Sequence, residues 1–248
     1  YEERGSGPAV LFSHGLLWSG AMFDAQVAAL SSRFRCIAYD HRGQGRSATS
    51  PAPYDMERLT ADAATLIEKL GAAPCHFVGL SMGGFVGLRL AARRPELVRT
   101  LTLVESAGDA EPWWNVPKYR AMSLVSRFFG YRPIIGIVMR IMFGTSYLGD
   151  RARAPERERL RGELLALDPP RVDAALAAVI GRRPLSDELG RITTPTLVLH
   201  GDEDRAIVLG RAAATARAIP GARLVVIPRA GHTSSVEAPE AINRELGA

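Results

Sequence analysis

Short apolar runs and segments with helical periodicity alternate along most of the chain. The apolar runs are too short for helices and are bounded by Gly, Pro or polar residues, which is typical of buried strands. These runs predict strands at residues 9–12, 35–39, 76–80, 100–104, 196–199 and 224–227. Apolar residues at helical spacing predict helices at residues 23–30, 59–70, 85–93 and 210–218, and from residue 239 onwards. Because strands and helices alternate along the chain, the pattern predicts a parallel sheet covered by helices on both faces.

One long segment, residues 106–189, breaks this alternation. It has no strand signal, is helical in character and is rich in aromatic residues. Helices inserted after a central strand are typical of a cap over the strand ends, where α/β proteins bind ligands. We therefore expect a core made of residues 1–105 and 190–248 and a helical cap made of residues 106–189. The alternative is that the aromatic residues only pack the insert against the core.

Composition and charge are ordinary for a globular protein. Of the 248 residues, 47% are hydrophobic and 23% are charged, with a net charge of +5. The arginines are scattered, and the densest charged segment, residues 150–159, alternates in sign as a solvated helix face does. The best candidate for a membrane span, residues 134–143, is too short and contains Arg140. We therefore expect no nucleic-acid and no membrane partner, and a cytoplasmic location because no signal peptide begins at Tyr1.

The sequence VGLSMGG at residues 78–84 places one serine between glycines, where a predicted strand gives way to a helix. Gly79 and Gly83 lie two residues before and two residues after Ser81, at positions where side chains would collide in a very tight turn. This spacing predicts a strained elbow that pushes the Ser81 hydroxyl out of the sheet. The alternative is a flexible turn that happens to contain serine. The other motifs of the sequence have to distinguish between these two interpretations.

A serine hydroxyl becomes a nucleophile when a base takes its proton and a third group orients that base. Among the five histidines, His232 is the one in a loop after the last predicted strand. Three carboxylates follow the strand at 196–199 and are candidates for the third group: Asp202, Glu203 and Asp204. The ends of parallel strands meet at one edge of a sheet, so such groups can converge on Ser81.

The chain resembles the α/β-hydrolase superfamily, and within it the small esterase, perhydrolase and lactonase-like members. The resemblance rests on five segments in the family's order: residues 12–15, 39–47, 79–84, 201–204, and 231–232 together with 237–239. The second segment carries the pattern D-x-R-G-x-G-x-S and the fourth the pattern G-x-x-D. The resemblance implies an α/β-hydrolase fold, with a helical cap inserted after the strand that follows the nucleophile helix.

The resemblance also implies roles for individual residues. Ser81 is the nucleophile, His232 the base, and Asp204, the last residue of G-x-x-D, the acid. The backbone N–H groups of Leu16 and Met82 form the oxyanion hole. No metal and no organic cofactor is implied.

Several expectations concern the surroundings of these residues. Glu105 also ends a predicted strand and stays open as an alternative acid, because some family members place the acid there. We interpret four polar residues of the first two motifs as structural: His14, Asp40, Arg42 and Arg46. The walls of the substrate pocket are expected to include Leu17, Trp18, Trp113, Trp114 and Phe143.

The family pattern has consequences for the first strand and for the two cysteines. Residues 1–5 resemble the end of the second strand of the family's opening hairpin, so we expect them at a sheet edge. Cys36 and Cys75 lie on the two strands that flank residues 10–12, roughly 9–10 Å apart. Because a disulfide needs Cα atoms within about 7 Å, we predict none.

Together these features predict a serine hydrolase that cleaves carboxylic esters or lactones of small molecules through an acyl-enzyme intermediate. A carbon–carbon bond hydrolase, or a cofactor-free perhydrolase or haloperoxidase, with the same triad is an alternative. Leu17 stands where perhydrolase-like members often carry proline, which favours ester hydrolysis. A receptor that binds a ligand on this fold without turnover is disfavoured, because all three triad residues are present. The oligomeric state, monomer or homodimer, stays open.

Overall fold

The computed structural model of the protein describes residues 1–49 and 54–247, and its centre is a seven-stranded sheet. The strand order is β1-β3-β2-β4-β5-β6-β7. β1 runs antiparallel to β3, and all other neighbouring strands are parallel. The strands are β1 (Glu2–Arg4), β2 (Ala9–Ser13), β3 (Arg35–Tyr39), β4 (Cys75–Leu80), β5 (Val98–Val104), β6 (Thr196–Gly201) and β7 (Arg223–Ile227). The predicted fold class is confirmed, and all six predicted strands are present.

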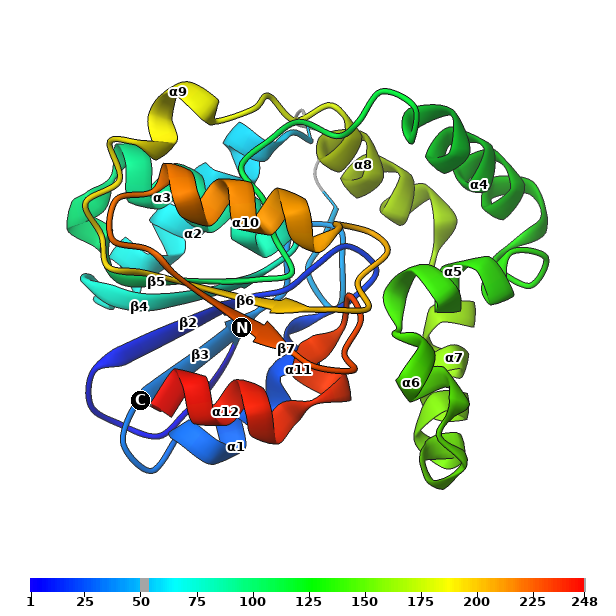
Figure 1. The fold of residues 1–248 in the computed structure, drawn as a ribbon, viewed down its shortest axis with the longest axis horizontal. Helices are drawn as coiled ribbons and strands as arrows, with labels where there is room; N and C mark the ends of the chain where they lie inside the picture. Colours follow the sequence, from blue (N-terminus) through cyan, green and yellow to red (C-terminus); the bar gives the residue numbers. More distant parts are fainter. Residues whose placement is uncertain (50–53, 248) are drawn as a thin grey trace.

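Helices cover both faces of the sheet (Figure 1). One face carries α2 (Met56–Lys69), α3 (Met82–Arg93) and α10 (Leu209–Ala218). The other carries α1 (Asp24–Leu30), α11 (Ser234–Glu237) and α12 (Pro239–Gly247). Every helix that the periodicity predicted in the core is found, with ends shifted by a few residues at most.

Successive residues of the central strands belong to two different apolar layers. On β4, Phe77 packs with the layer formed by α2 and α3, whereas Val78 packs with the layer on the opposite face. Leu11 and Phe12 on β2 divide in the same way. Because both faces are buried, neighbouring strand residues are all apolar, which explains the continuous apolar runs in the sequence.

Between β5 and β6, where the structure describes every residue, the chain forms only helices. They are α4 (Val116–Phe129), α5 (Ile135–Met142), α6 (Thr145–Gly149), α7 (Ala154–Leu165), α8 (Pro169–Ile180) and α9 (Ser186–Leu189), with a short 3₁₀ turn at Arg151–Arg153. In Figure 1, α4 to α8 stand beside the C-terminal ends of the strands. α9 lies back on the core, where Leu189 joins the apolar layer of α3 and α10. In the described part of the chain, no helix has the length and apolar character needed to cross a bilayer.

The two cysteines lie on strands on either side of β2, as predicted. Cys36 pairs with Val10 across one edge of β2, and Cys75 lies on β4 at the other edge. Both thiols are free and buried. Burial raises the pKa of Cys36 to about 11 and that of Cys75 to about 12, so both are neutral thiols at physiological pH.

Candidate active site

Ser81 occupies a tight turn between the end of β4 and the start of α3. Its backbone has φ 50° and ψ −109°, a strained conformation for a residue with a side chain. A Cβ on Gly79 would lie 2.4 Å from the carbonyl oxygen of Gly83. A Cβ on Gly83 would lie 1.9 Å from the carbonyl oxygen of Ser13, so only glycine fits at either position. The two glycines that flank the serine therefore let the elbow form against β2.

Hydrogen bonds hold this strained turn in place. The Ser81 N–H donates to the carbonyl oxygen of Val104 at 2.9 Å. The Ser106 hydroxyl donates to the carbonyl oxygen of Ser81 at 3.0 Å. Both partners come from the end of β5, so the neighbouring strand fixes the position of the serine. The residue itself is nearly buried and lines a cavity beneath the cap.

His232 and Asp204 form a hydrogen-bonded pair in the loops after β7 and β6. Their Nδ1 and Oδ2 atoms are 2.8 Å apart, and both side chains are buried. The other oxygen of Asp204 accepts the N–H groups of Ala206 and Ile207 at 2.8 and 3.1 Å. Burial would raise the pKa of Asp204, but His232 and these N–H groups outweigh it and hold the pKa below its usual value. An ionised Asp204 accepts the Nδ1 proton, which leaves Nε2 as the basic nitrogen of His232.

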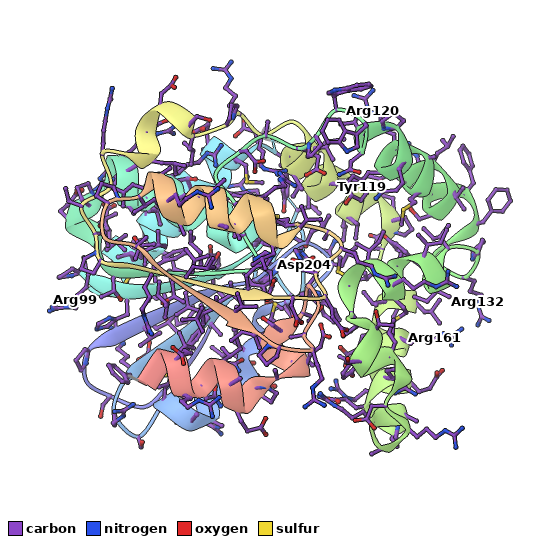
Figure 2. All side chains as sticks on the ribbon, viewed as in Figure 1. Arg99, Tyr119, Arg120, Arg132, Arg161 and Asp204 are labelled. Carbon is purple, nitrogen blue, oxygen red and sulfur yellow. The ribbon has the colours of Figure 1, made fainter. Side chains whose placement is uncertain are left out.

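Figure 2 shows Asp204 at the end of the sheet that faces the cap. The two other carboxylates of this loop point elsewhere. Asp202 accepts the N–H of Arg229 at 2.7 Å. Glu203 accepts the N–H and the hydroxyl of Ser146 at 2.7 and 2.6 Å, which ties α6 to the core. Asp204 is therefore the carboxylate of the three that meets His232.

Glu105, the alternative acid, is fully buried behind Asp204. Both of its oxygens accept the Gly201 N–H, at 2.8 and 3.0 Å, and Oε2 lies 3.3 Å from Nδ1 of His200. Burial first and the charge of Asp204 second raise its pKa well above the usual value, which favours the protonated form of Glu105. His200 contacts the Ile207 carbonyl through Nε2 at 2.7 Å, whereas its buried Nδ1 has no hydrogen-bond partner among the described residues.

Glu105, His200 and Asp204 together could also suggest a metal site. They bring three candidate ligand atoms within 4.8 Å of one another. However, Asp204 already binds His232, and both carboxyl groups accept backbone N–H groups. We therefore assign this cluster to hydrogen bonding around the acid rather than to metal binding.

The loop after β2 is fixed by a buried histidine. His14 donates from Nδ1 to the Gly15 carbonyl at 2.7 Å and accepts the His41 N–H on Nε2 at 2.9 Å. Burial lowers the pKa of His14 to about 4, so the ring stays neutral and keeps both bonds. Leu16 follows directly, and Leu17 has a positive φ of 74°. The bonds of His14 thus set the path of the backbone that brings Leu16 to the cavity.

The polar loop after β3 supports this strand end from the other side. Asp40 accepts the N–H groups of Gly20 and Arg46 at 2.7 and 2.8 Å. Arg42 forms a two-pronged ion pair with Asp62 on α2. These contacts bind the loop to its surroundings and none of them reaches the cavity, in keeping with the structural roles predicted for Asp40, Arg42 and Arg46.

Met82 begins α3, and its N–H is one of the N-terminal helix donors that lack an intrahelical partner. Its side chain is buried in the core layer beside Gln44, whose Nε2 lies 3.9 Å from the Met82 sulfur. The side chain therefore takes no part in the cavity wall. Leu16, the other predicted oxyanion residue, does line the cavity.

The cavity lies between α3 and the cap helices α4, α5 and α8. The cavity has a volume of about 100 Å³. From the core it is lined by Leu16, Leu17, Ser81, Phe85, Ala206, Ile207 and His232. From the cap it is lined by Glu111, Tyr119, Met122, Ser123, Ser126, Tyr131, Ile134, Val138, Ile141, Met142, Val172, Asp173, Leu176 and Val179. Ser81 and His232 therefore face one largely apolar space.

Most of the residues expected to form the pocket walls are elsewhere, although Leu17 does line the cavity. Trp18 and Phe143 are buried against each other, with ring centroids 6.0 Å apart, and do not reach the cavity. Trp113 and Trp114 are 78% and 64% exposed on the outside of the cap. These four predictions are wrong because aromatic content does not reveal which side of a helix or loop faces inward. The real cap wall is mainly aliphatic, which the sequence offered no way to distinguish from ordinary core.

Glu237 is a site residue whose role is not evident from the motif at residues 237–239 alone. Its Oε2 accepts the N–H groups of Gly144 and Gly231 at 2.8 and 2.9 Å, and Oε1 accepts the Thr233 N–H at 3.1 Å. One buried carboxyl thus joins the cap to the residues on both sides of His232. Burial raises the pKa of Glu237 to about 7.

Comparisons with known proteins agree with this fold. A family model described as the alpha/beta hydrolase fold matches residues 8–239. A protein named as a carbamate hydrolase from Pseudomonas savastanoi is 29% identical, over 98% of this chain and 94% of its own length. A thermophilic esterase from Thermogutta terrifontis superimposes with a TM-score of 0.90 at 31% identity, covering 99% of this chain and 90% of the esterase. The enol-lactonase from Burkholderia xenovorans gives 0.90 at 29% identity, covering 99% and 94%.

Proposed function

The chain belongs to the α/β-hydrolase family and is a hydrolase, and on this premise we propose that it cleaves carboxylic esters or lactones through a serine acyl-enzyme. The proposal rests on one observation: Ser81 and His232 line the same cavity. Ser81 lies on its strained elbow, and Asp204 holds the His232 ring from behind. A nucleophile, a base and an orienting acid are the groups that acyl transfer requires.

In the proposed reaction, Ser81 Oγ attacks the substrate carbonyl while Nε2 of His232 takes the hydroxyl proton. The imidazolium that forms is stabilised by the ionised Asp204, and it then returns the proton to the leaving alcohol. A water molecule, activated by the same histidine, attacks the acyl-enzyme and releases the carboxylic acid. We assign the oxyanion hole to the N–H groups of Leu16 and Met82, each worth about 10²–10³ in rate by analogy with other acyl-transfer sites.

The relatives support this class of substrate. The names of the three reported above refer to an esterase, an enol-lactonase and a carbamate hydrolase. Esters, lactones and carbamates all present a carbonyl that bears a heteroatom leaving group, so one triad can act on each. We therefore include all three kinds of compound in the test.

The cavity wall favours a neutral, apolar acyl group. It carries two carboxyl side chains, Glu111 and Asp173, and no Lys or Arg among the described residues that line it. Arg182 pairs with Glu111 at 3.1 Å from behind the wall, and Ser123 donates to Asp173 at 2.5 Å. A negative charge on the substrate would find no cationic partner in this lining and would be repelled by Asp173.

The proposal is tested by the Ser81→Ala variant with p-nitrophenyl esters of graded length, an aryl carbamate and a homoserine lactone. We expect the variant to lose esterase activity and to keep the unfolding transition of the wild type. A fluorophosphonate probe should add its mass to Ser81 of the wild type and leave Ser81→Ala unlabelled; the exposed Ser32→Ala is the matched control. Ester turnover that survives Ser81→Ala would overturn the mechanism. Binding of these compounds by the wild type without any turnover would instead favour a receptor.

A further inference from the structure

The net charge of the protein is concentrated in one part of the cap. Residues 112–149 contain five cations, Lys118, Arg120, Arg127, Arg132 and Arg140, and no Asp or Glu. Since the whole chain has 31 Lys and Arg and 26 Asp and Glu, the remaining residues hold 26 of each sign. All five of these cations are exposed. The excess of +5 is therefore a local property of α4, α5 and the turns beside them.

The same part of the cap exposes most of the large apolar side chains that reach solvent. Trp113 is 78% exposed and Phe128 is 70% exposed, and Trp114, Leu124, Phe129 and Ile137 are also exposed. Large aromatic side chains in such a cluster are unusual on the surface of a protein without a partner. This cluster is outside the cavity, so the proposed reaction does not explain it.

The periodicity of α4 arranges these residues as a stripe with charged edges. Residues at i, i+4, i+7 and i+11 share one face of a helix, and here they are Pro117, Ala121, Leu124 and Phe128, all exposed. At 100° per residue, Arg120 and Arg127 fall on one flank of this stripe and Lys118 on the other. The opposite face of α4 lines the cavity with Tyr119, Met122 and Ser126. α4 thus has two apolar faces. The inner face lines the cavity, and the outer one is an exposed stripe bordered by cations.

We propose that the outer face of the cap, formed by α4, its preceding turn and the start of α5, docks on an anionic lipid surface. A helix that lies in a membrane interface inserts Trp, Phe and Leu at the acyl boundary, and its Lys and Arg contact the anionic headgroups. The cations Lys118, Arg120, Arg127 and Arg132 and the exposed Trp113, Trp114, Leu124 and Phe128 supply both kinds of contact on one surface. Figure 2 shows Arg120 and Arg132 on this outer side, away from the sheet. Binding of this kind lies on the surface and needs no helix that crosses the bilayer.

This inference departs from the expectation, drawn from the scattered arginines of the sequence, that no membrane takes part. The folded chain gathers Arg120, Arg127 and Arg132, together with Lys118, on one face without acidic neighbours in the sequence. A second copy of the chain is a poorer occupant. Two copies related by a twofold axis would place this positive face against itself, and like charges repel. The proposal concerns binding alone and does not depend on the hydrolytic reaction.

The test is co-sedimentation of the full chain with vesicles of phosphatidylglycerol and phosphatidylcholine in equal parts, compared with vesicles of phosphatidylcholine alone. We expect binding to the anionic vesicles that weakens with added salt. Trp113 and Trp114 are exposed whereas Trp18 is buried, so tryptophan emission should shift to the blue on binding. The double variant Arg127→Gln/Arg132→Gln should bind about 25-fold more weakly, at about fivefold for each cation removed.

The matched control removes the same charge elsewhere. Arg99→Gln/Arg217→Gln changes two exposed arginines, on β5 and at the C-terminal end of α10, and should bind as the wild type does. Figure 2 shows Arg99 at the end of the molecule opposite the cap. Leu124→Ser/Phe128→Ser should lose at least tenfold in vesicle binding with an unchanged unfolding midpoint, because both side chains are exposed.

Five results would overturn the proposal. The first is no binding to the anionic vesicles, and the second is equal binding to the vesicles of phosphatidylcholine alone. The third is an equal loss in the Arg99→Gln/Arg217→Gln control. The fourth is a dimer in sedimentation velocity that Leu124→Ser/Phe128→Ser dissociates, because the second copy would then be the occupant. Tighter binding to heparin than to the anionic vesicles would assign the surface to a soluble polyanion instead.

Discussion

Glu237 gives a stability prediction whose size follows from the structure. Its buried carboxyl has a pKa of about 7 in place of the ordinary 4.5, and burial is the main cause. A carboxyl that holds its proton more tightly in the folded state than in the unfolded chain stabilises the fold fully at pH values below 4.5. This stability is lost as the pH rises from 4.5 through 7. The difference between the two pKa values corresponds to about 3 kcal/mol of unfolding free energy.

The substitution Glu237→Gln keeps the shape of the side chain and removes its titration. We expect the stability of the wild type relative to this variant to fall by about 3 kcal/mol between pH 4.5 and pH values above 7. Groups that titrate equally in both proteins cancel in this difference. The glutamine loses an acceptor for one of the three N–H groups, which adds an offset that does not vary with pH.

The assay is urea unfolding at several pH values across this window, followed by circular dichroism. Glu240→Gln is the matched control, because Glu240 is exposed and lies three residues further along. Its stability should run parallel to that of the wild type. Parallel curves for the wild type and Glu237→Gln would contradict this prediction, since they would mean that burial does not hinder the ionisation of Glu237.

Three further predictions concern the site and its support. Asp204→Asn should lower kcat/KM for p-nitrophenyl acetate by about 10⁴, because the amide cannot stabilise the imidazolium. Glu105→Gln should stay within about tenfold, because Glu105 does not contact His232 and its raised pKa favours the neutral form that glutamine mimics. Comparable losses in the two variants would reassign the acid. Gly83→Ala should cost more than about 4 kcal/mol in urea unfolding or prevent folding, since its Cβ would lie 1.9 Å from the Ser13 oxygen. Gly162→Ala, in open space on α7, should stabilise by about 0.5–1 kcal/mol, and similar effects at both glycines would contradict the packing argument. An ester with a carboxylate at the far end of its acyl chain should react roughly 30-fold more slowly than its neutral analogue. This factor corresponds to about 2 kcal/mol of repulsion from Asp173 at about 7 Å and a dielectric constant of about 20. Equal kcat/KM values for the two esters would contradict the inference that the pocket favours a neutral acyl group.

The core of this protein could be predicted because its signals are local. A strand buried on both faces must be apolar at every position, so the strands at 76–80 and 100–104 can be recognised in isolation. The elbow is equally local, because Gly79 and Gly83 are required by atoms within a few residues of Ser81 or on the adjacent β2. Asp204 and His232 follow strands whose order in the sheet is fixed by the fold. Once the sheet was predicted, their positions at one edge of it followed.

The cap could not be predicted in the same way, because a periodic pattern shows that a helix has an apolar face but not what covers that face. On α4, Tyr119 and Met122 face the cavity while Leu124 and Phe128 face solvent, and all four are apolar or aromatic. The sequence contains both stripes, and only the path of the chain between β5 and β6 decides which one is inward.

The difference lies in how many neighbours fix each residue. Phe77 on β4 is enclosed by two strands and by helices on its face of the sheet, so burial is its only option once the strand forms. Phe128 depends on one helix and its placement, and it is 70% exposed because α4 lies at the outer edge of the cap. Its aromatic character therefore serves something other than the core. Apolar residues of a cap that remain exposed after folding are evidence of a contact made outside the chain, and on α4 the cations that border them indicate the charge of that contact.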